Sequence, residues 1–481
     1  MRNSFRHSLS ALIILMGSLF ALILLVYDEA SVTQIIVSCN AFIYLVICWN
    51  RFSSHPKDVL EIDTVYLVFF GIYHILPIAV YSLTGIYGDT RLDRIVAFCF
   101  MLSLLGFAAG FYSSLWSKVI LIFPRLAGTW RAWEPRLAAG FLIAFGIVLL
   151  YLLVTTVGLA IYTEAVYVDV YAAESGKGIF SVGLIFISVG LLTLYIASTS
   201  DKKMSWLAII VFVACVLLSF RMGRRRQVLE LGIGLLAIRH FYIKPVRTKV
   251  LLIGAIAILP VFVMIGQARA YLSGGIDAMV EYVKYNFSVD ELQYVTGEPE
   301  TVALALRETV WYMEGDEYRY GRTFVEAFEI LVPLSINAER PLAPSEWFVR
   351  IYDPNVADKG GGYSYALIAE GYLNFGLLGV FAVFFVEGLF LRTLIEYRKR
   401  APDNKGRGLL YAVVLTATIS LLRGDFASLL KANIVSAVLP TLIVVLWLSR
   451  HPSLYGEALA GTGKLKGFKT TMPRLPGFKR S

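Results

Sequence analysis

The chain of 481 residues is poor in charge, and this alone limits what it can be. Charged residues make up 16 % of it and hydrophobic residues 57 %. A typical soluble domain has about 25 % charged residues. The composition therefore excludes a soluble globular protein and a disordered chain, and it predicts that most of the chain lies in lipid.

Several chemical motifs are also missing. The four cysteines stand in apolar runs without short spacing, so neither a disulfide framework nor a zinc ligand set is visible. No GxGxxG, Walker loop, CxxC pair or HExxH occurs, which removes the usual signatures of NAD chemistry, nucleotide-driven transport and zinc hydrolysis. We therefore expect no metal, no cofactor and no nucleic-acid partner.

Long apolar runs dominate what is present. A membrane span needs about 20 apolar residues. Twelve stretches meet this need, two of them short: 8–27, 31–50, 63–82, 94–115, 137–157, 179–199, 206–220, 226–240, 250–267, 373–393, 408–423 and 429–449. The first stretch follows basic residues but precedes no small-residue cleavage site, so we interpret it as a retained anchor.

The distribution of Lys and Arg predicts the orientation. With the N-terminus in the cytoplasm, the cytoplasmic connections and both tails hold 27 of the 44 Lys and Arg residues. Of the other 17, eight lie in one long segment, and long segments count little in the positive-inside rule. Both termini are therefore expected in the cytoplasm of a bacterial inner-membrane protein.

These spans divide the chain into four parts. Residues 1–267 hold spans one to nine, 268–372 form a long outer segment, 373–449 hold the last three spans and 450–481 form a basic tail. The predicted fold is an all-α, polytopic membrane protein with about twelve transmembrane helices and one long, partly helical outer segment. In the long segment, apolar spacing predicts helices over 276–287 and 300–314, and Pro, Gly and Asn predict a loop over 333–362.

A cluster of arginines joins the seventh and eighth spans, on the predicted outer side. At about 100° per residue, Arg224 and Arg225 each fall within about 60° of Arg221 around a helix, whereas Arg226 points elsewhere. Guanidinium suits phosphate because its planar fork binds two oxygens and stays protonated. The cluster therefore predicts an anion site, although a cap that snorkels to lipid headgroups or a different topology would also explain it.

Further arginines lie near the predicted outer surface. Arg269 and Arg423 stand at span ends, where a membrane-embedded anion is within reach. Arg319 and Arg322 lie in the long segment and are candidates for contacts with substrate. Each alone also fits a solvated or salt-bridged surface residue.

An acidic residue precedes the tenth span in GGGYSYALIAEGYLNFG, residues 360–376. If this stretch is helical, Tyr363, Glu370 and Asn374 share one face. An acid so close to the membrane is expected either to pair with an arginine or to be desolvated, and the desolvated state suits a general base. Glu370 is thus the first candidate for a catalytic base, and Asp425 is the alternative. Tyr363 and Asn374 are candidates for substrate contacts.

The pattern resembles the O-antigen polymerase (Wzy) family of bacterial polysaccharide polymerases. The resemblance covers the layout of spans with one long outer segment before a late span. Its best local match is GGGYSYALIAEGYLNFGLLG from Gly360 to Gly379, followed by Gly223–Arg226 and Gly266–Arg269.

The resemblance implies the reaction. A glycan on undecaprenyl pyrophosphate would be transferred to the sugar of an incoming lipid-linked repeat unit, with no metal needed. The arginines Arg221, Arg224, Arg225, Arg269 and Arg423 would then hold the pyrophosphate. Undecaprenyl-pyrophosphate-linked oligosaccharide, membrane lipid and a chain-length regulator are the partners that this reading allows.

Two other functions stay open. An O-antigen ligase shares outer-face arginines but has a histidine in its long outer loop, and residues 268–372 contain none. A lipid-linked oligosaccharide flippase or other transporter would explain polar residues between helices, but no inverted repeat is visible.

Overall fold

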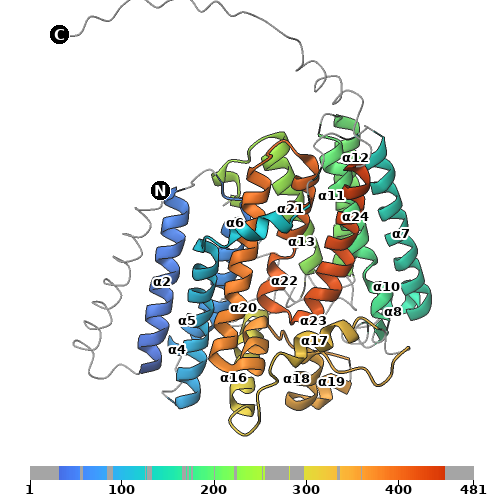
Figure 1. The fold of residues 1–481 in the computed structure, drawn as a ribbon. Coiled ribbons are helices and arrows are strands. Elements are labelled where there is room, and N and C mark those ends of the chain that lie inside the picture. Colours follow the sequence, from blue (N-terminus) through green and yellow to red (C-terminus); the bar gives the residue numbers. More distant parts are fainter. Residues whose placement is uncertain are drawn as a thin grey trace, which may run out of the picture.

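The structure is a computed structural model. It describes residues 32–54, 58–83, 90–124, 133–164, 177–199, 201–221, 225–251, 297–332, 336–358 and 360–449, together with a few isolated positions. These residues form helices and turns and no strand (Figure 1). The prediction of an all-α fold is confirmed for this part of the chain.

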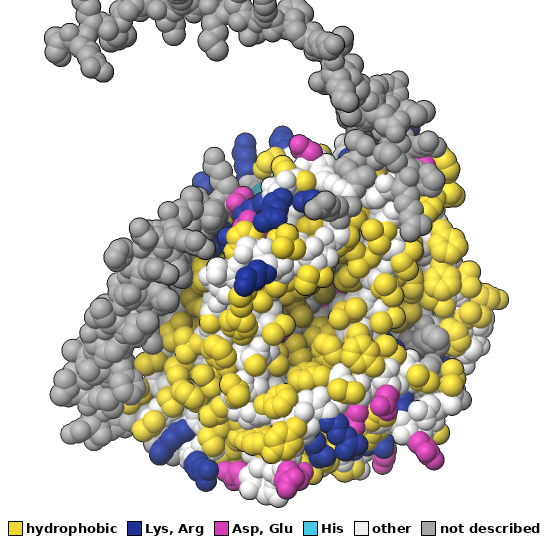
Figure 2. Space-filling view, in the orientation of Figure 1, with side chains coloured by type: hydrophobic (Ala, Val, Ile, Leu, Met, Phe, Trp, Pro, Cys, Tyr) yellow, Lys and Arg dark blue, Asp and Glu magenta, His cyan; other side chains and the backbone are white. Residues whose placement is uncertain are grey.

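Seven helical segments are long and apolar enough to cross a membrane. Two shorter apolar helices, Gly183–Ala197 and Lys203–Ser219, lie beside them. Figure 2 shows the result on one face, where apolar side chains form a broad belt between two charged rims. The seven segments are α2 (Val32–Ser54), α3–α4 (Ile62–Phe70 and Leu76–Leu83, joined by η1, Gly71–Ile75), α5 (Arg91–Tyr112), α7 (Glu134–Val157), α20 (Leu367–Lys399), α21–α22 (Lys405–Thr416 and Thr418–Arg423), and α23–α24 (Phe426–Ser428 and Leu439–Ser449, joined by η6, Leu429–Val438).

The predicted count of twelve spans stays a prediction. Spans 8–27 and most of 250–267 lie outside the described residues. The other predicted spans coincide with helical segments, including α11 (Gly183–Ala197), α12 (Lys202–Arg221) and α13 (Arg225–Ile238), which continues into the π-helix η3 (Arg239–Ile243). The chain is thus a multi-pass membrane protein.

Helices α5 and α20 form the centre of the bundle, where their backbones approach closely. A Cβ atom on Gly110 of α5 would lie 1.9 Å from the backbone oxygen of Phe385, and one on Gly388 of α20 would lie 2.2 Å from that of Phe107. In lipid, small residues allow this close packing, which replaces the hydrophobic drive that water would supply. The pair forms a rigid support for the segment that precedes α20.

Helix α20 is broken near its start. Phe375 and Gly376 leave the helical region, and Gly376 has φ 60° and ψ −143°. The short first part then folds back, because a Cβ on Gly379 would lie 2.0 Å from the backbone oxygen of Gly371. In a straight helix, residues eight apart are about 12 Å apart along the axis. The predicted tenth span, 373–393, therefore starts too early: its continuous helix begins after Gly376.

The long segment folds onto one end of the bundle (Figure 1). The helix predicted over 300–314 is confirmed as α16 (Gly297–Tyr312), and α17 (Arg322–Glu329) follows it. The helix predicted over 276–287 lies outside the described residues, apart from a single helical position.

The loop predicted over 333–362 is wrong in part, because α18 (Pro344–Tyr352) and α19 (Pro354–Asp358) lie within it. Proline is compatible with the first turn of a helix, where its missing N–H has no helical partner. Glu346 accepts a hydrogen bond from the backbone N–H of Ala343 at 3.4 Å, and Phe348 is buried. Capping and an apolar face thus stabilise a helix that composition alone did not indicate.

Buried ion pairs hold the opposite end of the bundle together. Arg398 pairs with Glu61, which also accepts a hydrogen bond from Tyr411 at 2.9 Å. Arg51 pairs with Asp63 at 2.5 Å. These pairs lie far from the long segment, so that segment and the helix ends beside it remain as the place for a site.

Candidate functional site

Glu370 lies in the first turn of α20 and is 0 % exposed. Its Oε1 accepts a hydrogen bond from Thr323 Oγ1 at 2.7 Å, and its Oε2 accepts one from the backbone N–H of Phe426 at 2.6 Å. Thr323 belongs to α17 and Phe426 to α23. One carboxylate therefore links the long segment, α20 and the turn before η6.

Asn374 lies one turn after Glu370 and extends this link. Its Nδ2 donates to Thr323 Oγ1 at 2.7 Å and to the backbone oxygen of Glu370 at 2.8 Å. Its Oδ1 accepts from the backbone N–H of Gly321 at 3.0 Å. The predicted pairing of Asn374 with Glu370 on one face is confirmed, and both side chains bind the start of α17.

Asp425, the alternative base, is also 0 % exposed. Its Oδ1 accepts from the backbone N–H of Ser428 at 2.7 Å, which caps α23. Its Oδ2 accepts from the backbone N–H of Ser345 in α18 at 2.9 Å. We call Glu370, Asn374, Asp425 and Thr323 the carboxylate network.

The carboxylate of Glu370 has no arginine partner among the ion pairs of the described residues. Its two oxygens instead have a hydroxyl and a backbone amide as donors. Of the two states expected for Glu370, the structure shows the desolvated one. A buried carboxyl without a cation is costly unless hydrogen bonds compensate, which explains why both oxygens are engaged.

Tyr363 does not join the network. Helix α20 begins at Leu367, so the prediction that Tyr363 shares a helical face with Glu370 is wrong. The chain from 361 to 366 is extended, and the Tyr363 hydroxyl donates to Asp353 Oδ2 at 2.9 Å. Burial and the nearby Asp353 carboxylate raise the pKa of Tyr363. Its role as a substrate contact stays a prediction.

Arg319 and Arg322 flank the segment that binds Asn374. The backbone N–H of Arg319 donates to the oxygen of Leu373 at 3.0 Å, which fixes its position beside α20. The Arg319 guanidinium lies 3.5 Å from Asp316, and that of Arg322 lies 2.5 Å from Glu326. The Arg322 side chain is 72 % exposed, so its pair is easily exchanged for another anion.

The arginine-rich turn, residues 221–226, lies between two helices as predicted: α12 ends at Arg221 and α13 begins at Arg225. The side chains of Arg221, Arg224 and Arg225, and all of Arg269, lie outside the described residues. Arg226 is described, and its Nε lies 3.5 Å from Glu230 Oε1. Arg423 is in the last turn of α22, two residues before Asp425.

Two predicted parts of the site lie at the same end of the bundle. Ser420 of α22 donates to Glu230 of α13 at 3.0 Å, one helical turn after the start of α13. The same α22 leads through Arg423 into Asp425 and Phe426, which bind the long segment and Glu370. The arginine-rich turn and the carboxylate network are therefore connected through α22.

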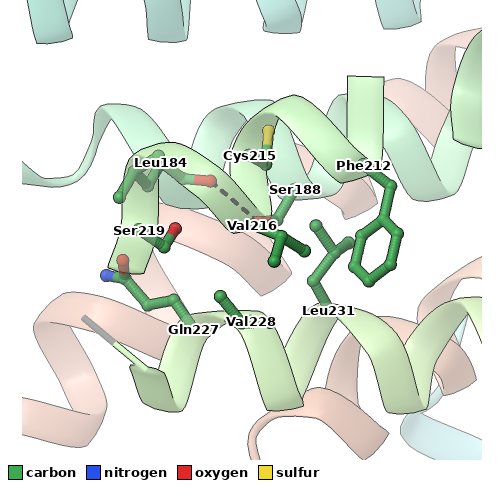
Figure 3. Close-up of a pocket in the computed structure, with 9 residues that line it drawn as sticks. All are labelled: Leu184, Ser188, Phe212, Cys215, Val216, Ser219, Gln227, Val228 and Leu231. Carbon is green, nitrogen blue, oxygen red and sulfur yellow. Dashed lines mark hydrogen bonds between the residues drawn. The ribbon is translucent and has the colours of Figure 1, made fainter. Parts of the chain in front are cut away.

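Two cavities lie beside the start of α13. The first is enclosed by α11, α12 and α13, and Figure 3 shows Ser219 and Gln227 next to each other in its wall. The second lies between α11, α13, α21 and η6. Both are lined by Ser188, Gln227 and Leu231.

Sequence reasoning missed these cavities. Their polar lining comes from helices that were interpreted only as spans. One signal was available, because Glu230 is an acid inside the predicted span 226–240, and an ionisable residue within a span marks a functional position by default.

Fold and site together define a multi-pass membrane protein with a polar site at one end of its bundle. Residues 9–451 match the family model described as O-antigen polysaccharide polymerase Wzy. The chain belongs to this family, and its role is that of an O-antigen polymerase, a glycosyltransferase-like enzyme of polysaccharide biosynthesis that acts on lipid-linked oligosaccharide repeat units. No curated protein and no solved structure matches the chain.

Proposed function

We propose that the protein transfers a growing glycan from undecaprenyl pyrophosphate to an incoming lipid-linked repeat unit, at the outer face of the bacterial cytoplasmic membrane. The observation that carries the proposal is the connection through α22 between the arginine-rich turn and the carboxylate network. A transfer of this kind needs both cations for a pyrophosphate and a carboxylate for a proton, in one place.

The chemistry follows from the substrates. A hydroxyl of the incoming unit attacks the anomeric carbon of the growing glycan, the bond from that carbon to the phosphate oxygen breaks, and undecaprenyl pyrophosphate leaves. Arg221, Arg224 and Arg225, with Arg269 and Arg423, are proposed to neutralise the charge that develops on the pyrophosphate. Because guanidinium groups supply this charge, we propose that no metal is required.

Glu370 is proposed to take the proton of the attacking hydroxyl, with Asp425 as the alternative. In the present structure both oxygens of Glu370 are engaged and buried. It can therefore act only after one donor leaves, and Thr323 is the natural one, because α17 is a short helix on the surface of the bundle. On this proposal, movement of α17 opens the site, and Asn374, Arg319 and Arg322 move with it or guide the glycan.

The proposal includes a location and a partner. The charge distribution supports cytoplasmic termini and a long segment on the outer side, where a glycan already moved across the membrane would be met. A regulator of chain length would then act on the same outer face.

Deletion of the gene, followed by a gel of surface glycan, tests the proposal. Loss of a polymerase leaves lipid A core capped with a single repeat unit. Loss of a ligase leaves uncapped core while long polymer stays on undecaprenyl pyrophosphate, and loss of a flippase traps single units on the inner leaflet. Long polymer that persists on the surface of the deletion strain contradicts the proposal.

A further inference from the structure

The second cavity has a wall that is unusually polar for the interior of a membrane bundle. It lies between α11, α13, α21 and η6, in the part of the bundle next to the arginine-rich turn. Polar groups inside a membrane are costly and normally face one another, water or a ligand. The polar residues of this wall are Ser188, Arg226, Gln227, Glu230, Thr416 and Asn433.

The charges of this wall balance. Arg226 lies 3.5 Å from Glu230, which also accepts a hydrogen bond from Ser420 at 3.0 Å. A wall with one cation and one anion in contact does not favour phosphate. It suits a neutral group with many hydroxyls, because amide, carboxylate and guanidinium groups offer planar donors and acceptors for hydroxyls.

Two independent observations indicate a ligand. First, Gln227 Oε1 is buried and has no hydrogen-bond partner among the described residues, although it lines both cavities. A buried amide oxygen without a partner costs about 1–3 kcal/mol, which a ligand can relieve. Second, Asn433 is presented by η6, a π-helix of 10 residues. π-Helices are rare and are frequent at functional sites.

We propose that this cavity is a glycan subsite that takes the sugar ring next to the pyrophosphate of a lipid-linked repeat unit. The inference rests on the proposed function, because it requires the pyrophosphate to lie at the arginine-rich turn, directly beside Arg226. Gln227, Glu230 and Asn433 then hydrogen-bond the hydroxyls of that ring. The subsite separates two tasks: the arginines bind the anion, and the cavity recognises the sugar attached to it.

The test removes the amides without adding bulk or charge. Gln227→Met and Asn433→Leu keep similar volumes and place apolar groups inside a membrane bundle, so folding is preserved. Asn40→Leu is the matched control, since Asn40 is a buried amide of α2 that lines neither cavity. The full-length protein is placed in proteoliposomes with lipid-linked repeat units extracted from a strain that lacks the gene.

Two constants are measured for each variant: the KM for the lipid-linked repeat unit, and the inhibition constant of undecaprenyl pyrophosphate, which has no sugar. Loss of one sugar hydrogen bond should raise KM about three- to tenfold, and the double variant should raise it about ten- to a hundredfold. The inhibition constant should stay within about twofold of the wild type, and Asn40→Leu should change neither value.

Three results would overturn the subsite. A double variant with the KM of the wild type shows that the cavity does not bind sugar. A KM and an inhibition constant that rise together show that it holds phosphate instead. If the double variant makes no polymer, loss of undecaprenyl pyrophosphate binding counts against the subsite, and normal binding supports it. A wild-type protein that makes no polymer refutes the proposed function itself, which is a distinct outcome.

Discussion

Removal of the Glu370 carboxylate measures what the carboxylate network does for the fold. Glu370→Ala leaves the Thr323 hydroxyl and the Phe426 amide without their acceptor, in a place that is 0 % exposed at Glu370. Each orphaned buried donor costs about 1–3 kcal/mol, so the substitution should lower the free energy of unfolding by about 2–6 kcal/mol. Thr323→Val removes one of these donors and should cost about 1–3 kcal/mol by the same reasoning.

The two substitutions share one hydrogen bond, so their effects should not add. A double-mutant cycle, measured by unfolding in SDS from mixed micelles, should give a coupling energy of about 1–3 kcal/mol. Arg392→Ala with Glu396→Ala is the control cycle, because that exposed i,i+4 pair lies at the opposite end of α20 and should couple by about 0.5 kcal/mol or less. Additive effects of Thr323 and Glu370 would refute the claim that this bond ties the long segment to α20.

Other predictions concern activity and backbone. Arg224→Ala or Arg225→Ala should abolish chain growth on a surface-glycan gel while the protein stays in the membrane, and wild-type chain length in both would refute the pyrophosphate clamp. Glu370→Gln should slow polymer formation at least about a hundredfold if the carboxylate accepts the proton, and a normal rate would reduce it to a positioning role. Gly376→Ala should destabilise the protein by about 1–3 kcal/mol or more, because φ is 60° there and a Cβ would lie 2.8 Å from the Tyr318 hydroxyl; an unchanged SDS midpoint would contradict this.

The sequence predicts the bundle well because its signal is local. Apolar runs of the length of a bilayer determine helices such as α5 and α7, whatever their neighbours are. The helix α16 was also predictable, because its apolar spacing needs no partner to be recognised.

Features that depend on distant contacts were not predictable. The hydrogen bonds of Glu370 join residues 47 and 56 positions away, and nothing local specifies them. The break at Gly376 requires both its positive φ and the close approach of Gly371 to Gly379, so the sequence alone reads as one continuous helix. Tyr363 was misplaced for the same reason, because helical spacing was extended past the true start at Leu367.

The candidate site was predicted in composition but not in arrangement. Arginines and a carboxylate near the membrane surface suggested where to look, and Glu370, Asn374 and Asp425 do lie close together. Glu230 was missed because a residue inside an apolar run was counted as part of a span. Its neighbours in the cavity come from four separate helical elements, which no single stretch of sequence brings together.

The central claim is that the arginine-rich turn faces the outside, where a lipid-linked pyrophosphate can reach it. Labelling tests it most directly: a single cysteine is placed by Gly223→Cys in a variant whose four native cysteines are replaced, and cells with a permeable outer membrane are treated with a membrane-impermeant maleimide. We predict labelling in intact spheroplasts, with protection by undecaprenyl pyrophosphate. Labelling that appears only after the inner membrane is opened would place the turn in the cytoplasm and contradict the account.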